Sequence, residues 1–107
     1  MSGYRILWLF VLFDLPVGSK NQRKLAADFR NKLLDLGFQM SQYSVYIKFC
    51  SGKEKAETLC RDIESVIPSA GKVHLIQITD KQYEGIRTYT GTNREYPNKN
   101  RGQLALF

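Results

Sequence analysis

The sequence has few of the residues that define several classes of protein. It contains two cysteines, Cys50 and Cys60, and their spacing matches no metal-binding motif. The single histidine, His74, could add only one more ligand, so we expect it to be structural. There are no internal repeats and no low-complexity tract, and 43% of the residues are hydrophobic. This composition is not that of a disordered chain.

Long hydrophobic runs are also missing. The longest, Ile6–Phe13, has eight apolar residues, far too few to span a bilayer as a helix. Arg5 precedes it as in a signal peptide, but Asp14-Leu15-Pro16 follow it and no convincing small-residue cleavage site does. We therefore expect a cytoplasmic protein with no membrane partner, in which both cysteines are reduced.

Acidic residues are outnumbered by basic ones. The chain has 16 Lys and Arg against 10 Asp and Glu, a net charge of +6 and a pI near 9.5. This excess favours an anionic partner, with nucleic acid first and an acidic membrane surface second. The length of 107 residues suits one domain, with a core over about 4–90 and an arm over about 91–107.

The Ile6–Phe13 run predicts a central strand that is buried on both faces. The next residue is Asp14, and Pro16 stops the chain from continuing in the sheet. A carboxylate at the end of a buried strand needs a partner, such as a metal ion, a cationic group or a helix N-terminus. Asp also favours turns, so Asp14 could simply cap the strand.

Two helices are predicted from capping boxes and apolar stripes. The box Ser19–Gln22 predicts a helix that runs to about Leu36 and is stopped by Gly37. A second box, Ser51–Glu54, predicts a helix that Pro68 ends. The residues expected on the apolar faces are Leu25, Ala26, Phe29, Leu33 and Leu36 in the first helix, and Ala56, Leu59, Cys60, Ile63, Val66 and Ile67 in the second.

The segments between and after these helices are rich in β-formers. Residues 37–49 are too many for one ordinary strand, so we expect two antiparallel strands, or a sharp break, around Ser41–Tyr43. Residues 71–79 predict another strand, and Asp80–Glu84 a helical turn closed by Gly85. Ile86–Tyr89 is a candidate short strand. The aromatic residues of 43–49 could stack on bases, but we favour core or dimer contacts for Tyr43, Tyr46 and Phe49.

The C-terminal part changes composition after Gly91. Residues 92–103 are polar and read as an arm or loop, and Leu104–Phe107 form an apolar end. An apolar segment after a polar linker could add a strand to a sheet edge of this molecule or of a partner.

The order strand, helix, strand, strand, helix, strand predicts an α+β fold of the ferredoxin-like kind, with both helices on one face of a four-stranded antiparallel sheet. Nothing else in the chain can cover the other face of the apolar first strand. We therefore expect a homodimer, packed sheet against sheet or edge to edge, with two-fold symmetry.

A two-fold axis near the end of the first strand would bring two copies of Asp14 together. Two carboxylates with waters suit Mg²⁺, which could then support phosphodiester chemistry. The alternative is a pair of Asp14 residues that only cap strands at an interface. Basic residues that could contact phosphate lie outside this pair: Lys20, Arg23 and Arg30 near one face of the first helix, and Arg87 in the candidate strand Ile86–Tyr89. An ordinary solvated helix face would account for the first three equally well.

Three stretches together resemble the small CRISPR-associated proteins of spacer acquisition, the Cas-two family. They are Phe13-Asp14-Leu15-Pro16, then Gly37-Phe38 followed by Gln42-Tyr43-Ser44-Val45-Tyr46, and the strand Val73–Thr79 followed by Asp80-Lys81-Gln82. The resemblance covers roughly residues 4 to 90, and the Gln-Tyr-Ser-Val-Tyr stretch is its most specific part.

The resemblance implies a ferredoxin-like homodimer in which two copies of the strand-end Asp, here Asp14, face each other and hold a divalent metal. It also implies a scaffold that sits between integrase subunits and holds a protospacer duplex, and metal-dependent endonuclease activity on RNA or DNA as in some members. The basic positions after the first strand correspond loosely to Lys20 and Arg23, and the segment that pairs with the partner subunit to Leu104–Phe107. Some members carry a basic residue where this sequence has Met40, so a cleavage mechanism that uses a cation there is not implied.

Three functions remain open at this point. The first is a metal-dependent phosphodiesterase that uses Asp14 from two chains. The second is a non-catalytic scaffold for double-stranded DNA, with Lys20, Arg23, Arg30 and Arg87 on phosphates. The third is a ferredoxin-like regulatory or small-ligand module that binds no nucleic acid. The resemblance favours the first two, which are physically compatible.

Overall fold

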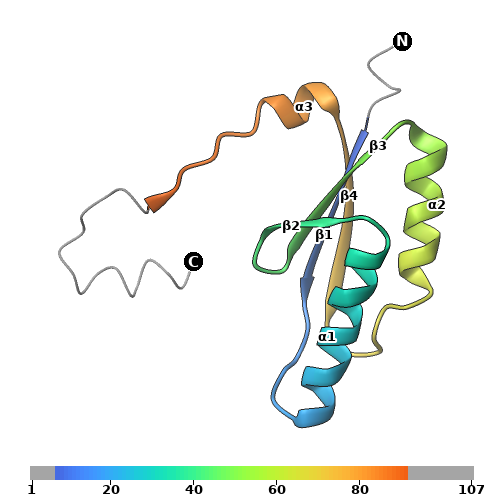
Figure 1. Cartoon of the computed structure of the whole chain (residues 1–107), viewed down its shortest axis with the longest axis vertical. Helices are drawn as coiled ribbons and strands as arrows, with labels where there is room; N and C mark the ends of the chain where they lie inside the picture. The colour runs from blue at the N-terminus through green and yellow to red at the C-terminus, as the bar shows by residue number, and fades with distance from the viewer. Residues whose placement is uncertain (1–6, 92–107) are drawn as a thin grey trace.

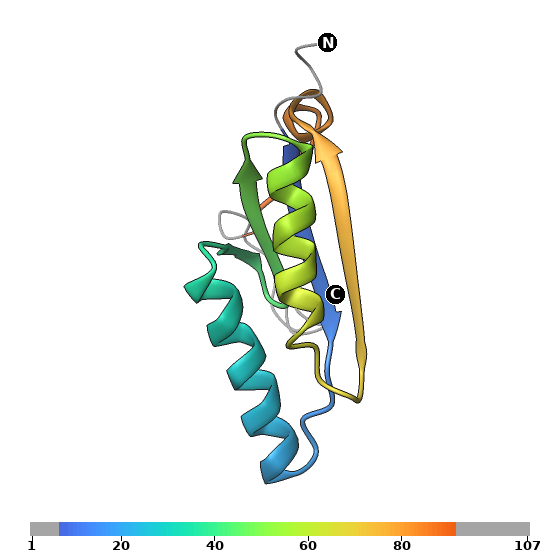
Figure 2. The same cartoon turned by 90° about the vertical axis from the view of Figure 1, so that its right-hand side faces the viewer.

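The computed structural model describes residues 7–91, which form a four-stranded antiparallel sheet with two helices packed on one face (Figure 1, Figure 2). The elements in chain order are β1 (Leu7–Asp14), α1 (Lys20–Asp35), β2 (Gln39–Gln42), β3 (Val45–Cys50), α2 (Lys53–Glu64), β4 (Lys72–Thr79) and α3 (Asp80–Glu84). The strands are ordered β2-β3-β1-β4, so the predicted ferredoxin-like α+β fold is confirmed. The predicted C-terminal arm and the Leu104–Phe107 segment lie outside the described residues.

The core lies between the sheet and the helices. Alternate residues of β1, namely Leu7, Leu9 and Val11, are buried there because successive side chains of a strand point to opposite faces. They pack with Phe29 and Leu33 of α1 and with the stripe of α2. Of the predicted stripe, Ala56, Leu59, Cys60 and Ile63 are buried. Val66 is only partly buried and Ile67 is exposed, because both follow the end of α2 at Glu64.

Residues 7–91 cover the other face of the sheet only in part. We call it the open face; by strand alternation and register it carries Trp8, Phe10, Leu12, Val45, Ile47, Phe49, Ile76 and Ile78. Within residues 7–91 of one chain, β1 is fully buried only on the helical face, and burial of its second face against a second copy stays a prediction. The short helix α3 covers the end of the open face where β1 begins: the Tyr83 ring stacks on Trp8 at 3.8 Å, and Trp8 Nε1 donates a hydrogen bond to Asp80 Oδ1 (3.0 Å).

The ends of α1 follow the sequence signals. Ser19 Oγ accepts a hydrogen bond from the Gln22 backbone N–H, and Ser19 N donates one to Gln22 Oε1, which is the predicted capping box. Gly37, with φ of 97°, ends the helix in a left-handed conformation. The prediction for Leu25 is wrong: its side chain is 42% exposed, because the first turns of α1 extend past the end of β1 (Figure 1).

The structure differs from the predictions at the start of α2 and at Ile86–Tyr89. The second capping box does not form, because α2 begins one residue later with Gly52 as its N-cap, and no side chain caps it. Ile86–Tyr89 form no strand: within the described residues this segment follows α3 and pairs with none of the four strands (Figure 1), and it lines a hollow together with Phe10, Val45 and Ile47 of the open face. The predicted break in 37–49 is confirmed, with the turn at Tyr43 and Ser44, whose φ is 63°. No helix in the described part of the chain has the length and hydrophobicity to cross a membrane.

Candidate metal and nucleic-acid site at the end of the first strand

Asp14 is the last residue of β1, and its side chain is exposed. Strand alternation places it on the open face, in line with Leu12, Phe10 and Trp8. It makes no hydrogen bond or ion pair with any described side chain, so both carboxylate oxygens remain accessible. Asp14 is therefore an accessible carboxylate at the edge of an apolar surface.

The start of β4 builds the surroundings of Asp14. Lys72 is the residue directly opposite Asp14 in the β1–β4 ladder, and His74 is opposite Leu12. Both side chains are exposed and, by the same alternation, lie on the open face. Asp14 thus has a cation and an imidazole as neighbours on the adjacent strand, although the Lys72 ammonium is more than salt-bridge distance from it.

The backbone of Gly71 packs closely against the end of β1. Its φ is +96°, and a Cβ added there would lie 2.7 Å from the Asp14 carbonyl oxygen and 3.1 Å from Leu15 Cα. Only glycine combines this backbone conformation with this approach. The connection between α2 and β4 therefore fixes the backbone from which the Asp14 carboxylate projects.

The predicted basic residues are not gathered into one patch. Lys20 and Arg23 lie at the start of α1, and Arg23 Nη1 donates a hydrogen bond to the carbonyl of Val17 (3.2 Å), in the loop that follows Asp14. Arg30 lies further along α1 and lines a pocket on the helical side of the sheet. Arg87 follows α3, which Figure 1 shows at the opposite end of β1 from Asp14. The structure thus associates Lys20 and Arg23 with the end of β1 and separates Arg87 from it.

One chain supplies only part of a metal site. Among residues 7–91 no three His, Cys, Asp or Glu side chains cluster closely enough to hold a metal ion. Mg²⁺ keeps several waters and takes only one or two protein carboxylates, so an accessible Asp14 fits as one of two protein ligands. A second carboxylate would have to come from another copy of the chain.

Sequence reasoning missed Lys72, His74 and Gly71 as neighbours of Asp14. The signal was present in the predicted topology, because a strand over 71–79 that runs antiparallel to 6–14 places residues 71–74 beside Asp14. The cysteines take no part in the site: Cys50 and Cys60 are buried free thiols. The role favoured for Tyr46 as a core residue is confirmed, since it is 1% exposed, whereas Tyr43 is 90% exposed in the hairpin turn.

Comparisons with known proteins identify the family. The family model for CRISPR associated protein Cas2 matches residues 7–86. A CRISPR-associated endoribonuclease Cas2 of Paracidovorax avenae is 50% identical over 107 residues, which cover 100% of this chain and 99% of the relative. Proteins with the same name from Flavobacterium psychrophilum and Parvibaculum lavamentivorans are 43% and 40% identical, over 100% and 94% of this chain and 93% and 100% of their own lengths. The chain therefore belongs to the family of CRISPR associated protein Cas2.

Proposed function

We propose that this protein works in CRISPR adaptation as a homodimer that, with an integrase subunit, holds protospacer DNA. In the same dimer, two copies of Asp14 would bind Mg²⁺ and support cleavage of RNA or DNA phosphodiesters. The observation that carries the proposal is the position of Asp14 on the open face. A second copy packed on the apolar residues of that face would also bring its own Asp14 toward the first.

The apolar residues of the open face support the dimer. Phe49 and Ile76 are 48% and 42% exposed, and they flank Trp8 and Phe10 on the two neighbouring strands. Adjacent exposed apolar side chains on a small domain mark a contact surface. Packing two such faces together would remove these side chains from water without adding any further element to the chain.

The chain's own residues define how a phosphodiester would be held. Asp14 offers two accessible carboxylate oxygens, and the backbone behind it is fixed by Gly71. Lys72, which is opposite Asp14, carries a charge suited to a non-bridging phosphate oxygen. A bound Mg²⁺ would supply Lewis acidity and a more acidic water. Lys20 and Arg23 would contact phosphates further along the strand.

Duplex binding tests the scaffold part of the proposal. Each phosphate contact contributes roughly −0.9 to the slope of log K against log salt on duplex DNA. The double variant Lys20→Gln/Arg23→Gln should lower both the affinity and that slope, whereas Asp14→Ala should leave both unchanged. Lys53→Gln, an exposed lysine at the start of α2, removes one charge outside the proposed surface and serves as the control. Failure of the wild type to bind duplex DNA would contradict the scaffold and favour a regulatory module.

A further inference from the structure

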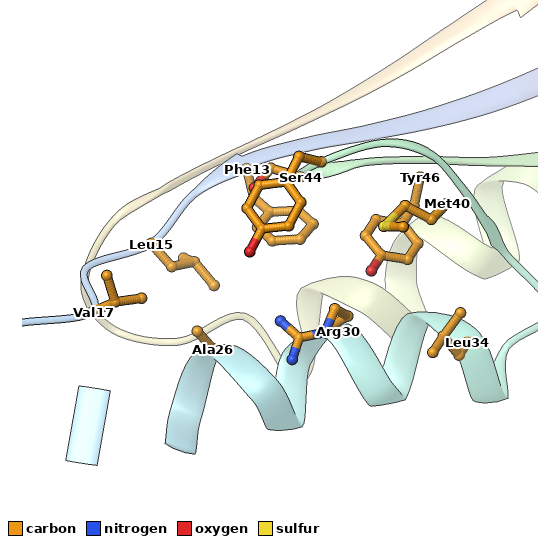
Figure 3. Close-up of a pocket in the computed structure, with 10 residues that line it drawn as sticks. Phe13, Leu15, Val17, Ala26, Arg30, Leu34, Met40, Ser44 and Tyr46 are labelled. Carbon is orange, nitrogen blue, oxygen red and sulfur yellow. The ribbon is translucent and has the colours of Figure 1, made fainter. Parts of the chain in front are cut away.

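A pocket of about 520 Å³ lies between α1 and the β2–β3 hairpin, on the helical side of the sheet (Figure 3). Phe13 and Leu15, the residues on either side of Asp14, form part of its wall, so it opens at the same strand end as the candidate metal site. The side chains that line the rest of the pocket include Val17, Arg30, Leu34, Met40, Tyr43 and Tyr46.

Two polar groups of the pocket have no partner among residues 7–91. Tyr46 is 1% exposed, yet its hydroxyl makes no hydrogen bond with a described residue. Arg30 likewise makes no ion pair or hydrogen bond there. Figure 3 shows both side chains directed into the space between α1 and the hairpin. Because a buried hydroxyl without a partner is costly, the pocket is suited to a ligand that hydrogen-bonds to Tyr46.

The rim of the pocket is apolar and exposed. Val17, Leu34 and Met40 are 56%, 47% and 55% exposed, and Tyr43 is 90% exposed. These four side chains gather around one opening instead of being scattered singly over the surface. An exposed apolar rim around convergent polar groups is typical of a ligand site.

We propose that this pocket binds one unpaired nucleotide of a single-stranded nucleic acid. The flat base would lie against the apolar walls, a polar edge of the base would pair with the Tyr46 hydroxyl, and Arg30 would bind the phosphate. Unpaired bases are recognised in this way, by apolar or aromatic surfaces together with hydrogen bonds to their edges. A guanidinium is well matched to phosphate.

The proposal rests on the nucleic-acid function proposed above but does not use Asp14 or duplex binding. A nucleotide combines the three features that the pocket asks for: an apolar ring, hydrogen-bonding groups on its edge, and an anion. An apolar side chain of a protein partner would satisfy the rim but would leave the Tyr46 hydroxyl and Arg30 unpaired. Charge and hydrogen bonding therefore favour the nucleotide.

Fluorescence anisotropy with labelled single strands provides the test. Oligouridylate and oligothymidylate are compared with abasic strands of the same length, which have the same phosphates but no bases. We expect the wild type to bind the base-bearing strands roughly tenfold more tightly, because base stacking is lost in the abasic ones. Equal affinities for the ribose and deoxyribose strands would show that the pocket recognises the base and the phosphate. A higher affinity for one of them would show whether RNA or DNA is the preferred ligand.

Three variants connect the base preference to the pocket. Tyr46→Phe keeps the core ring and removes only the hydroxyl, and should reduce the preference by roughly threefold. Arg30→Gln should weaken binding of base-bearing strands by roughly tenfold and that of abasic strands less, because a phosphate is held beside Arg30 only when a base occupies the pocket. Lys32→Gln, a matched loss of charge on an exposed residue of the same helix, should weaken base-bearing and abasic strands equally. Circular dichroism confirms that each variant is folded.

Equal affinity of the wild type for base-bearing and abasic strands would overturn the proposal, as would an unchanged preference in both Tyr46→Phe and Arg30→Gln. Occupation of the pocket by a partner protein would give the first of these results. Loss of duplex binding or of Asp14-dependent cleavage would contradict the proposed function and leave the base preference intact, so the two failures are distinguishable.

Discussion

Asp14 depends on its neighbours for its position. The carboxylate projects from the last residue of a central strand, and the carbonyl of the same residue is in close contact with Gly71. Lys72, which follows Gly71 in the chain, lies directly opposite Asp14 in the β1–β4 ladder. The site is therefore defined by the register between β1 and β4, and a change at Gly71 should affect both stability and the placement of Asp14.

We predict that Gly71→Ala destabilises the protein by about 1–3 kcal/mol, since the new Cβ would meet the Asp14 carbonyl in a backbone conformation that alanine disfavours. Urea denaturation gives the change in the free energy of unfolding. Gly18→Ala is the control: its φ is not positive, and its new Cβ would come no closer than 3.4 Å to Gln22 Oε1. Equal stability of the two variants would show that the contact with Asp14 is not restrictive.

The two thiols make stability depend on pH at the alkaline end. Burial raises the pKa of Cys50 and of Cys60 above the ordinary value of 9.0. The unfolded chain therefore releases these protons at lower pH than the folded protein does. Their contribution is complete below pH 9.0 and is lost as the pH rises through the raised pKa values.

We predict a fall in the free energy of unfolding above pH 9.0 that is smaller in Cys60→Ala than in the wild type. Urea denaturation of both proteins, at neutral pH and in alkaline buffer, measures it. The two proteins differ only at residue 60, so the comparison isolates the thiol. Parallel curves for the two proteins would contradict a role for Cys60 ionisation.

At the scale of elements, the two helices begin differently although both start signals look alike in sequence. Ser19 caps α1 through Gln22, with its Oγ 3.1 Å from Gln22 N. Ser51 caps nothing, because Gly52 occupies the N-cap position of α2. The stability of α2 comes instead from its buried stripe, which packs on the sheet.

We predict that Ser19→Ala costs about 1 kcal/mol of folding free energy, through the loss of an N-cap. Ser51→Ala should change stability by less than about 0.5 kcal/mol, as is usual for an exposed residue without a structural role. Thermal or urea unfolding of the pair checks both values. Equal costs would mean that Ser51 also caps its helix.

The helix α3 has only five residues, and side-chain contacts with β1 stabilise its position. The Trp8–Tyr83 stack and the Trp8–Asp80 hydrogen bond join it to the start of β1. We predict that Tyr83→Ala exposes Trp8, which should shift the tryptophan emission toward that of a hydrated indole. Because Trp8 is the only tryptophan in the sequence, the emission comes from this residue alone. Unchanged emission would show that α3 does not cover Trp8 in solution.

At the scale of the whole molecule, the open face is the sheet surface that residues 7–91 cover only in part. We predict that Ile76→Glu, in the middle of this face, converts the proposed dimer to a monomer, because a carboxylate buried in an apolar interface is costly. Light scattering after size exclusion measures the mass. Ile67→Glu introduces the same charge at a residue of similar exposure after α2 and should leave the dimer intact. A monomeric wild type, or a dimeric Ile76→Glu protein, would contradict the proposed interface.

Much of this architecture was accessible from the sequence, because its signals are local. The apolar run of β1, the Ser19 box, Gly37 and the α2 stripe each predict their own element, and their order predicts the sheet topology. The pocket was not accessible: Arg30 reads as part of a solvated helix face, and only the packing of α1 beside the hairpin brings it near Tyr46. The position of Lys72 beside Asp14 could be predicted only with the register between β1 and β4. Ile86–Tyr89 has the composition of a strand, but in the described chain it pairs with no strand of the sheet.

The most direct test of the account is Mg²⁺-dependent cleavage by the wild type and by Asp14→Asn, purified identically, on single-stranded RNA and on duplex DNA. Asn keeps the shape of the side chain and removes the charge that a metal requires. We predict that the wild type cleaves only with Mg²⁺ and that Asp14→Asn does not, although both have the same mass in solution and the same affinity for duplex DNA. Cleavage by both proteins, or by neither, would contradict the assignment of Asp14 to a metal site.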